Sequence, residues 1–223
     1  LYVNGRYSSQ STSDMRKDAL KDFITNAIAT TKLLAEDPYR TLPDPKYYQG
    51  RSKIDLEQVD PAYKNYTPEN RHSLVRSIEN AALEKGGDKV ISVTASTQDG
   101  HAEGFSMSSN GFEGYEEGTF YVAGAEMTVQ DEGDRRPNGY EYAVAVNQNN
   151  LPSPVEVGKE CAVRTMNLLG AKKIKTETLP IIIENRNVGR LFGGFLQAML
   201  GRSIQQKQSF LADMKGKKVA SEK

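Results

Sequence analysis

Few side chains in this sequence could bind a catalytic metal, since its 223 residues include only two histidines and one cysteine. A catalytic zinc site uses about three protein ligands and keeps one position open. His72 lies in an expected helix and His101 follows an expected turn, and neither has a His or Glu four or five residues away. Cys161 has apolar neighbours, which indicates a buried side chain rather than a nucleophile. No zinc site is evident from these residues.

Other catalytic patterns are also missing from the sequence. It contains no Gly-x-x-x-x-Gly-Lys phosphate loop and no Gly-x-Ser-x-Gly nucleophile motif. The glycines of residues 189–194 do not have the Gly-x-Gly-x-x-Gly spacing of a dinucleotide-binding turn. The adjacent carboxylates Glu116-Glu117 and Asp131-Glu132 fall in expected turns, where solvated loop charges are the simpler interpretation.

The segment Asn187 to Leu200 has the pattern of a helix but almost no side chain that could bind a metal or transfer a proton. Arg190 is its only ionisable side chain. Two adjacent glycines, Gly193 and Gly194, lie in its middle, where each destabilises a helix by roughly 1 kcal/mol relative to alanine. Either another backbone packs closely against them, or other residues occupy these positions in related proteins.

Three helices are expected before this segment in the sequence. Apolar residues recur at helical spacing over residues 20–34, and Asp37-Pro38 ends that helix. A second helix is expected over residues 68–86, with proline at its first position and glycine after its end. Residues 153–156 form a capping box, which predicts a third helix that runs to Gly170.

Alternating stretches between the second and third helices predict an antiparallel meander. Turn signals at Asp99-Gly100 and Asn110-Gly111 separate the early strands. The expected strands cover residues 90–97, 101–108, 119–130 and 140–147. Along the third, one face carries Tyr121, Ala123, Ala125, Met127 and Val129; along the fourth, one face carries Tyr140, Tyr142, Val144 and Val146. A further strand, Leu179 to Glu184, is almost wholly apolar and is expected to be central and buried.

The composition limits the possible classes of protein. Hydrophobic residues make up 37% and charged residues 26% of the chain, which favours a packed core over disorder. Lys plus Arg and Asp plus Glu both number 29, and a net charge of zero argues against a nucleic-acid partner. No signal peptide and no apolar run of membrane-spanning length is present, so we expect a soluble, cytoplasmic protein without a membrane partner.

Several stretches in order resemble the TldD/PmbA family, the "modulator of DNA gyrase" peptidases. The likeness covers nearly the whole chain and rests on five groups of residues: Asp37-Pro38-Tyr39 with Leu42-Pro43-Asp44-Pro45; Ser109-Asn110-Gly111-Phe112; residues 157–174; Leu179-Pro180-Ile181-Ile182-Ile183; and residues 209–221. The resemblance implies an α+β fold, with an N-terminal strand and helix followed by a larger domain in which helices flank the meander sheet. The implied domains are the C-terminal part of the family's N-terminal domain at 1–48, a linker at 49–67 and the central domain at 68–223, with the family's C-terminal domain absent.

The resemblance also offers an explanation for the residues of the segment Asn187 to Leu200. Catalytic TldD-type members carry His-Glu-x-x-x-His on a helix, where the histidines bind zinc and the glutamate is the general base. Gly193 aligns with the first histidine, Gly194 with the glutamate and Ala198 with the second histidine. The chain therefore resembles the PmbA/TldE type, which lacks the zinc motif, so no catalytic residue and no metal ligand is expected in it.

The expected partners follow from the same resemblance. They are a TldD-like subunit that carries the zinc, in a heterodimer, or a second copy in a homodimer, and an unfolded peptide substrate. Candidate peptide-binding residues are Ser109, Asn110 and Gly111. Two alternatives stay open: an active metallopeptidase that uses ligands outside this chain, and a regulator that binds DNA gyrase.

Overall fold

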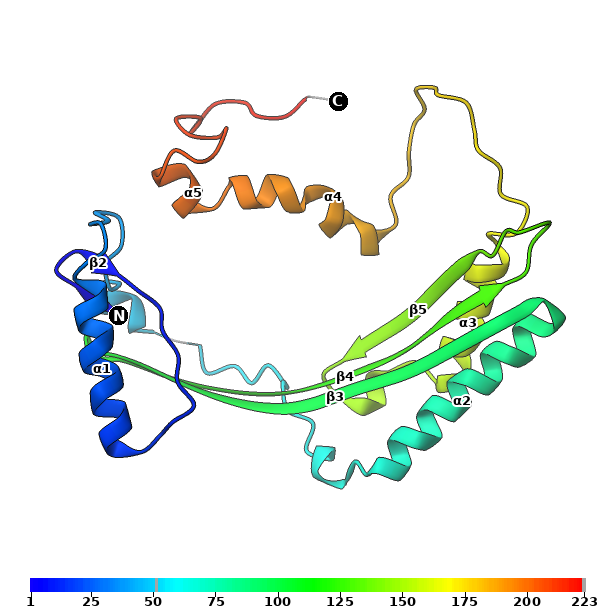
Figure 1. Ribbon diagram of the computed structural model, residues 1–223, viewed down its shortest axis with the longest axis horizontal. Helices are drawn as coiled ribbons and strands as arrows, with labels where there is room; N and C mark the ends of the chain where they lie inside the picture. The colour runs from blue at the N-terminus through cyan, green and yellow to red at the C-terminus, as the bar shows by residue number, and fades with distance from the viewer. Residues whose placement is uncertain (51, 222–223) are drawn as a thin grey trace. The chain divides into compact units, whose positions relative to one another are not determined.

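The chain forms two compact units in the computed structural model, which describes residues 1–50 and 52–221 (Figure 1). One unit joins residues 1–43 to the segment from 176 onward, and the other spans residues 44–175. This division differs from the boundaries 1–48, 49–67 and 68–223 that the sequence suggested. The stretch 44–67 groups with the sheet because its side chains bond to the strands, as described below.

The unit that contains both ends of the chain is built mainly of helices. β1 (Tyr2–Val3) and β2 (Arg6–Tyr7) form a short hairpin through Asn4-Gly5, and both turn residues have the positive φ that this turn requires. The helices are α1 (Lys17–Thr31), α4 (Asn185–Ala198) and α5 (Gly201–Gln205). The expected first and final helices are confirmed, although α1 ends at Thr31 and not at Asp37-Pro38 as the sequence suggested.

The expected buried strand from Leu179 to Glu184 is wrong. These residues have no regular secondary structure and pair with no strand of the described chain. Ile181 and Ile182 are exposed by 75% and 102%. An apolar run of this kind forms a strand only beside another strand edge, and this unit offers none in the described residues beyond the two-residue hairpin.

The other unit is a three-stranded antiparallel sheet with two helices across one face (Figure 1). Its strands are β3 (Val90–Ser108), β4 (Phe112–Val129) and β5 (Asn138–Ala145), in the order β3-β4-β5. The helices are α2 (Pro68–Gly86) and α3 (Pro154–Met166), each with a capping box at its start. Short 3-10 helices are η1 (Pro45–Tyr48), η2 (Tyr63–Asn65), η3 (Gly87–Lys89) and η4 (Gln148–Asn150). α3 ends at Met166, four residues before the Gly170 end that the sequence suggested.

The core lies between β4 and the two helices. Fully buried residues include Ile78 of α2, Met127 and Val129 of β4, and Cys161 of α3. The alternation expected along residues 119–130 is confirmed, and the face of Tyr121, Ala123, Ala125, Met127 and Val129 is the inward one, since all five are buried. Cys161 lies within this core, which matches the sequence interpretation of a buried cysteine.

The expected turn at Asp99-Gly100 is wrong, because β3 continues through both residues to Ser108. A Cβ at Gly100 would lie 2.5 Å from the Phe120 ring, so the glycine accommodates a cross-strand aromatic side chain rather than a turn. β5 pairs only with residues 121–128 of β4. Residues 100–108 and 112–120 therefore extend past β5 as a two-stranded hairpin, which we call the ribbon.

The face of the sheet opposite the helices carries exposed aromatic and aliphatic side chains. Its exposed members, which we call the open face, are Phe120, Tyr140, Tyr142 and Val144. On β5 it is Glu141 that points inward, where its carboxylate bonds Arg164 of α3 over 2.7 Å. Gly139 allows this close approach, because a Cβ there would strike Thr165. No described helix is long and apolar enough to cross a membrane.

Candidate functional site

α4 is the helix on which the resemblance would place a zinc motif. No side chain of α4 is buried, and its only ionisable residues are Arg186 and Arg190. Apart from its chain neighbours and the backbone of α4 itself, a Cβ added at Gly193 or Gly194 would meet no heavy atom within 4 Å in the described chain. Close packing within these residues therefore does not explain the two glycines. Ala198 ends the helix and, like them, offers no metal ligand.

The three candidate peptide-binding residues lie together at the tip of the ribbon. Ser108 pairs with Phe112, so Ser109, Asn110 and Gly111 form a three-residue loop, and Gly111 has a φ of +92°. A loop of this length commonly ends in a residue with positive φ, which glycine adopts at little cost. The side-chain nitrogen of Asn110 donates to the Tyr48 hydroxyl over 2.7 Å. The loop is therefore held against η1.

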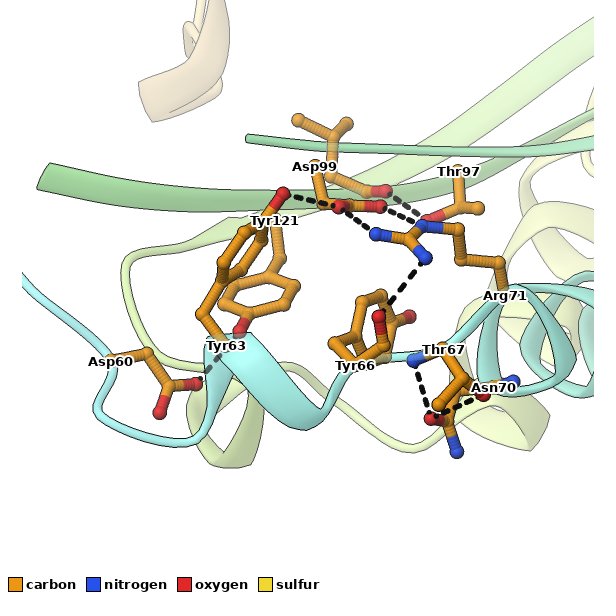
Figure 2. Close-up of polar contacts among 10 residues, drawn as sticks. Asp60, Tyr63, Tyr66, Thr67, Asn70, Arg71, Thr97, Asp99 and Tyr121 are labelled. Atoms are coloured by element: carbon orange, nitrogen blue, oxygen red, sulfur yellow. Dashed lines mark hydrogen bonds and ion pairs between the residues drawn. The ribbon is translucent and has the colours of Figure 1, made fainter. Parts of the chain in front are cut away.

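A polar cluster connects the start of α2 to β3 (Figure 2). Arg71 donates through Nε and Nη2 to the two Asp99 oxygens over 2.7 and 2.6 Å, and the Tyr63 hydroxyl donates to Asp99 over 3.0 Å. The Arg71 guanidinium also lies over the Tyr66 ring, 4.8 Å from its centre. Hydrogen bonding from Arg71, helped by Tyr63, lowers the pKa of Asp99 although burial opposes this. Asp99 is thereby kept ionised where the sequence suggested a turn.

A second buried carboxylate, Asp60, fixes the segment before α2 to the end of the sheet. It accepts hydrogen bonds from the backbone N–H groups of Ala62 and Gln148, over 2.8 and 3.0 Å, and from the Tyr121 hydroxyl over 2.9 Å (Figure 2 shows the bond to Tyr121). Its own N–H donates to Thr119 Oγ1 over 2.8 Å. Burial raises the pKa of Asp60, but the three hydrogen bonds outweigh it and the net shift is downward. Since only 3% of Asp60 is exposed, it positions the chain and does not face a substrate.

One group of side chains on the ribbon has the composition of a metal site. His101 and Glu103 of β3 and Glu117 of β4 bring one ligand atom each to within 4.8 Å of one another. His101 Nε2 lies 2.9 Å from Glu117 Oε1, and the Tyr115 hydroxyl donates to Glu117 Oε2 over 3.0 Å. The hydrogen bonds from His101 and then Tyr115 lower the pKa of Glu117. The cluster therefore has nitrogen and oxygen donors, with an ionised carboxylate between two partners.

The sequence interpretation missed this cluster because it treated His101 as a lone residue after a turn. Once β3 runs unbroken, His101 and Glu103 project from the same face two residues apart, and Glu103 pairs directly with Glu117. The length of the loop at residues 109–111 could have revealed the cluster. A three-residue loop at 109–111 fixes this register, whereas a two-residue Asn-Gly turn shifts the pairing by one residue.

A groove of about 720 Å³ lies beside the same part of β4. Segment 54–61 forms one wall, and Tyr115, Glu116 and Glu117 form part of the other. Four carboxylates line it, from Asp55, Glu57, Glu116 and Glu117, and no Lys or Arg is among its lining residues. The groove and the cluster share Glu117, so the region is acidic on both sides of that residue.

Comparison with known families matches most of the chain. The sequence profile described as "PmbA/TldA metallopeptidase central domain" matches residues 56–169. The profile described as "PmbA/TldA metallopeptidase C-terminal domain" matches residues 176–223, which the sequence analysis placed in the central domain. The boundary between the two matches lies close to the division at residue 175 between the compact units.

Two curated relatives align along almost the whole chain. "Metalloprotease PmbA" of Escherichia coli O157:H7 is 27% identical over 222 residues, which are 98% of this chain and 48% of that protein. "Metalloprotease PmbA homolog" of Haemophilus influenzae is 26% identical over 221 residues, with the same coverage of 98% and 48%. The chain thus spans about half the length of the curated relatives it matches.

Two solved structures have the same fold. A putative modulator of DNA gyrase from Bacteroides thetaiotaomicron superposes with a TM-score of 0.89 at 34% identity, over 99% of this chain and 50% of that one. A second protein of that title, from Thermotoga maritima, has a TM-score of 0.74 at 15% identity over 94% of this chain and 46% of that one, a likeness of fold alone. With a central-domain match over residues 56–169, the chain belongs to the PmbA/TldD metallopeptidase family.

Proposed function

We propose that this chain is a PmbA/TldE-type subunit without a catalytic centre of its own, which holds an unfolded peptide for cleavage by a zinc-bearing TldD-like partner. The observation that carries the proposal is α4, where the aligned zinc-motif positions are Gly193, Gly194 and Ala198. None of these residues can bind zinc or transfer a proton, whereas zinc hydrolysis needs about three protein ligands and a general base.

The sheet supports the peptide-holding part of the proposal through its free edges. β3 is an edge strand along its whole length. β5 covers only residues 121–128 of β4, and beyond β5 the β4 edge is bonded at Thr119, whose N–H donates to the Gln58 carbonyl oxygen over 2.9 Å. Unpaired strand edges bind extended peptides by main-chain hydrogen bonds, which gives affinity with little dependence on sequence. The loop of Ser109, Asn110 and Gly111 closes the ribbon at one end of these edges. Recognition of unfolded chains requires this kind of tolerant contact.

The open face supplies apolar contacts on the same sheet. Tyr140 and Tyr142 are 55% and 45% exposed, and their rings stack with centres 6.3 Å apart. Exposed apolar patches of this kind mark interaction surfaces on folded proteins. An unfolded peptide presents aromatic and aliphatic side chains that these rings can bind, so the open face fits one wall of a peptide chamber.

A peptidase assay on the purified chain tests the missing catalytic centre. The chain is incubated with a denatured, alkylated polypeptide and zinc, alone and with a homologue that carries His-Glu-x-x-x-His. We expect chelator-sensitive cleavage only in the mixture, and a stable complex of the two chains in size-exclusion chromatography. Chelator-sensitive cleavage by this chain alone would refute the proposal. It would favour the alternative of an active metallopeptidase, which the names of the curated relatives suggest.

A binding assay tests the open face separately. Replacing both Tyr140 and Tyr142 with serine should weaken binding of a fluorescent unfolded peptide about tenfold, which corresponds to about 1.4 kcal/mol. Tyr47→Ser is the matched control, because Tyr47 is 70% exposed but lies in η1 rather than on the sheet. Equal losses in the control and the double variant would contradict a chamber wall at the open face.

A further inference from the structure

We propose that His101, Glu103 and Glu117 form a binding site for one divalent transition-metal ion of the zinc type on the ribbon. The site lies on β3 and β4, and it is separate from α4, where the family's zinc motif would fall. Its three donors are one imidazole nitrogen and two carboxylate oxygens. Zinc and its neighbours in the first transition row favour this mixture of nitrogen and oxygen ligands.

The geometry requires only side-chain adjustment. The three ligand atoms lie within 4.8 Å of one another, and two of them are already 2.9 Å apart. Bonds of about 2.0–2.2 Å in a tetrahedron place ligand atoms about 3.4 Å apart. The longest separation therefore has to shrink by at most about 1.4 Å and the 2.9 Å separation has to widen by about 0.5 Å, which rotation of partly exposed side chains can supply. The paired strands set the Cα positions of all three residues, so the backbone need not move.

The charges of the cluster favour a bound cation. Glu103 and Glu117 are directly paired across the two strands, and like charges in that position destabilise a sheet. His101 lies diagonally from Glu117 and contacts it, but one imidazole cannot neutralise two carboxylates. The neighbouring groove adds three more carboxylates, from Asp55, Glu57 and Glu116, and its lining includes no basic side chain. A divalent ion would relieve this repulsion.

Outer contacts already orient the ligands. The Tyr115 hydroxyl donates to the Glu117 oxygen that does not face His101, over 3.0 Å. The Tyr63 ring lies 5.9 Å from the His101 ring, centre to centre, on the side of η2. A hydrogen bond such as that from Tyr115 to Glu117 fixes the orientation of a ligand in metal sites. His101 and Glu117 keep 34% and 33% of their side chains exposed, so an ion can enter from solvent and retain water as a further ligand.

Titration of the full chain with zinc, followed by calorimetry, tests the site. We expect one zinc ion per chain, and at least a tenfold loss of affinity in His101→Ala and in Glu117→Gln. His72→Ala is the matched control, because His72 is the chain's other histidine and is exposed on α2, and its affinity should equal that of the wild type.

Thermal melts measure zinc binding without a peptidase assay, and they also show whether each variant is folded. Zinc should raise the midpoint of the wild type in proportion to the logarithm of its concentration and leave the midpoint of His101→Ala unchanged. Absorption of bound cobalt gives a second readout of a nitrogen-containing site. Absence of saturable zinc binding below millimolar concentration would overturn the proposal. Binding that survives His101→Ala, or that is lost in His72→Ala, would overturn it equally, whatever the outcome of the peptidase assay.

Discussion

Replacing Gly158 with alanine tests the tightest approach between α2 and α3. A Cβ at this position would lie closer than 3.0 Å to the Ile78 carbonyl oxygen, 2.9 Å from the Ala81 Cβ and 3.0 Å from the Ala82 nitrogen. Two of these three atoms belong to backbone inside a helix, so neither can rotate away. Ile78 and Ala82 are themselves fully buried, so the two helices must separate for the methyl group to fit.

The expected loss of stability is about 2 kcal/mol. Overpacking of a rigid core costs about 1–3 kcal/mol, and a clash with backbone belongs at the upper end of that range. Alanine recovers about 1 kcal/mol relative to glycine through its higher helix propensity. The difference corresponds to a fall of about 4–8 °C in the unfolding midpoint, at about 2–4 °C per kcal/mol for chains of this size.

Cys161 provides the assay for this part of the molecule. It is the chain's one cysteine, it is fully buried on the inner side of α3, and burial raises the pKa of its thiol. We expect Gly158→Ala to lower the midpoint in circular dichroism and to speed alkylation of Cys161 under native conditions. Gly193→Ala is the matched control, since a Cβ there meets open space and should stabilise α4 by about 0.5–1 kcal/mol. An unchanged or raised midpoint for Gly158→Ala would refute the packing argument.

Three further predictions concern the polar contacts. Asp60→Asn should destabilise the fold by about 2 kcal/mol, measured by urea unfolding, because an amide leaves at least one buried donor such as the Tyr121 hydroxyl poorly paired. Folding lowers the pKa values of Asp60 and Asp99, so both carboxylates stabilise the fold at pH values above the ordinary aspartate pKa of 3.8. Stability should therefore fall as the pH drops below 3.8, which thermal melts from pH 6 to about pH 2 measure. Asp60→Asn should make the melting midpoint depend less on pH. Asn110→Ala removes the bond to Tyr48 and should speed protease cleavage of the 109–111 loop without moving the global midpoint.

The sequence predicted the helices well because their signals are local. Capping boxes begin α2 and α3 at the positions that the residue patterns indicate. The inward face of β4 also followed from alternation. In contrast, the Tyr140 and Tyr142 face of β5 is exposed although it is the more apolar one. The close approach of α3 decided this, because Gly139 leaves room for Thr165, and that contact is not visible in a strand's own pattern.

Tertiary contacts explain one wrong turn prediction and one wrong strand prediction. Asp-Gly is a strong local turn signal, but Asp99 pairs with Tyr121 in the sheet and forms a two-point ion pair with Arg71 from this extended backbone. The apolar run from Leu179 to Glu184 is the opposite case. Its pattern fits a strand, but it forms none, because no described strand edge lies beside it. In both cases the outcome depends on whether a distant part of the chain supplies a partner, and propensity gives only a weak prior for such segments.

The unbroken β3 also links the two proposals for this chain. A turn at Asp99 would end the sheet beside α2, and neither the free edges of the ribbon nor the pairing of Glu103 with Glu117 would exist. A two-stranded hairpin is only marginally stable alone, and here it carries a pair of like charges directly opposite each other. The bonds of Asp60 and Asp99 hold one end of the ribbon, and the bond from Asn110 to Tyr48 holds the other. An ion bound by His101 and both glutamates would cross-link the strands between these ends, and would keep the edges extended for a peptide to pair with.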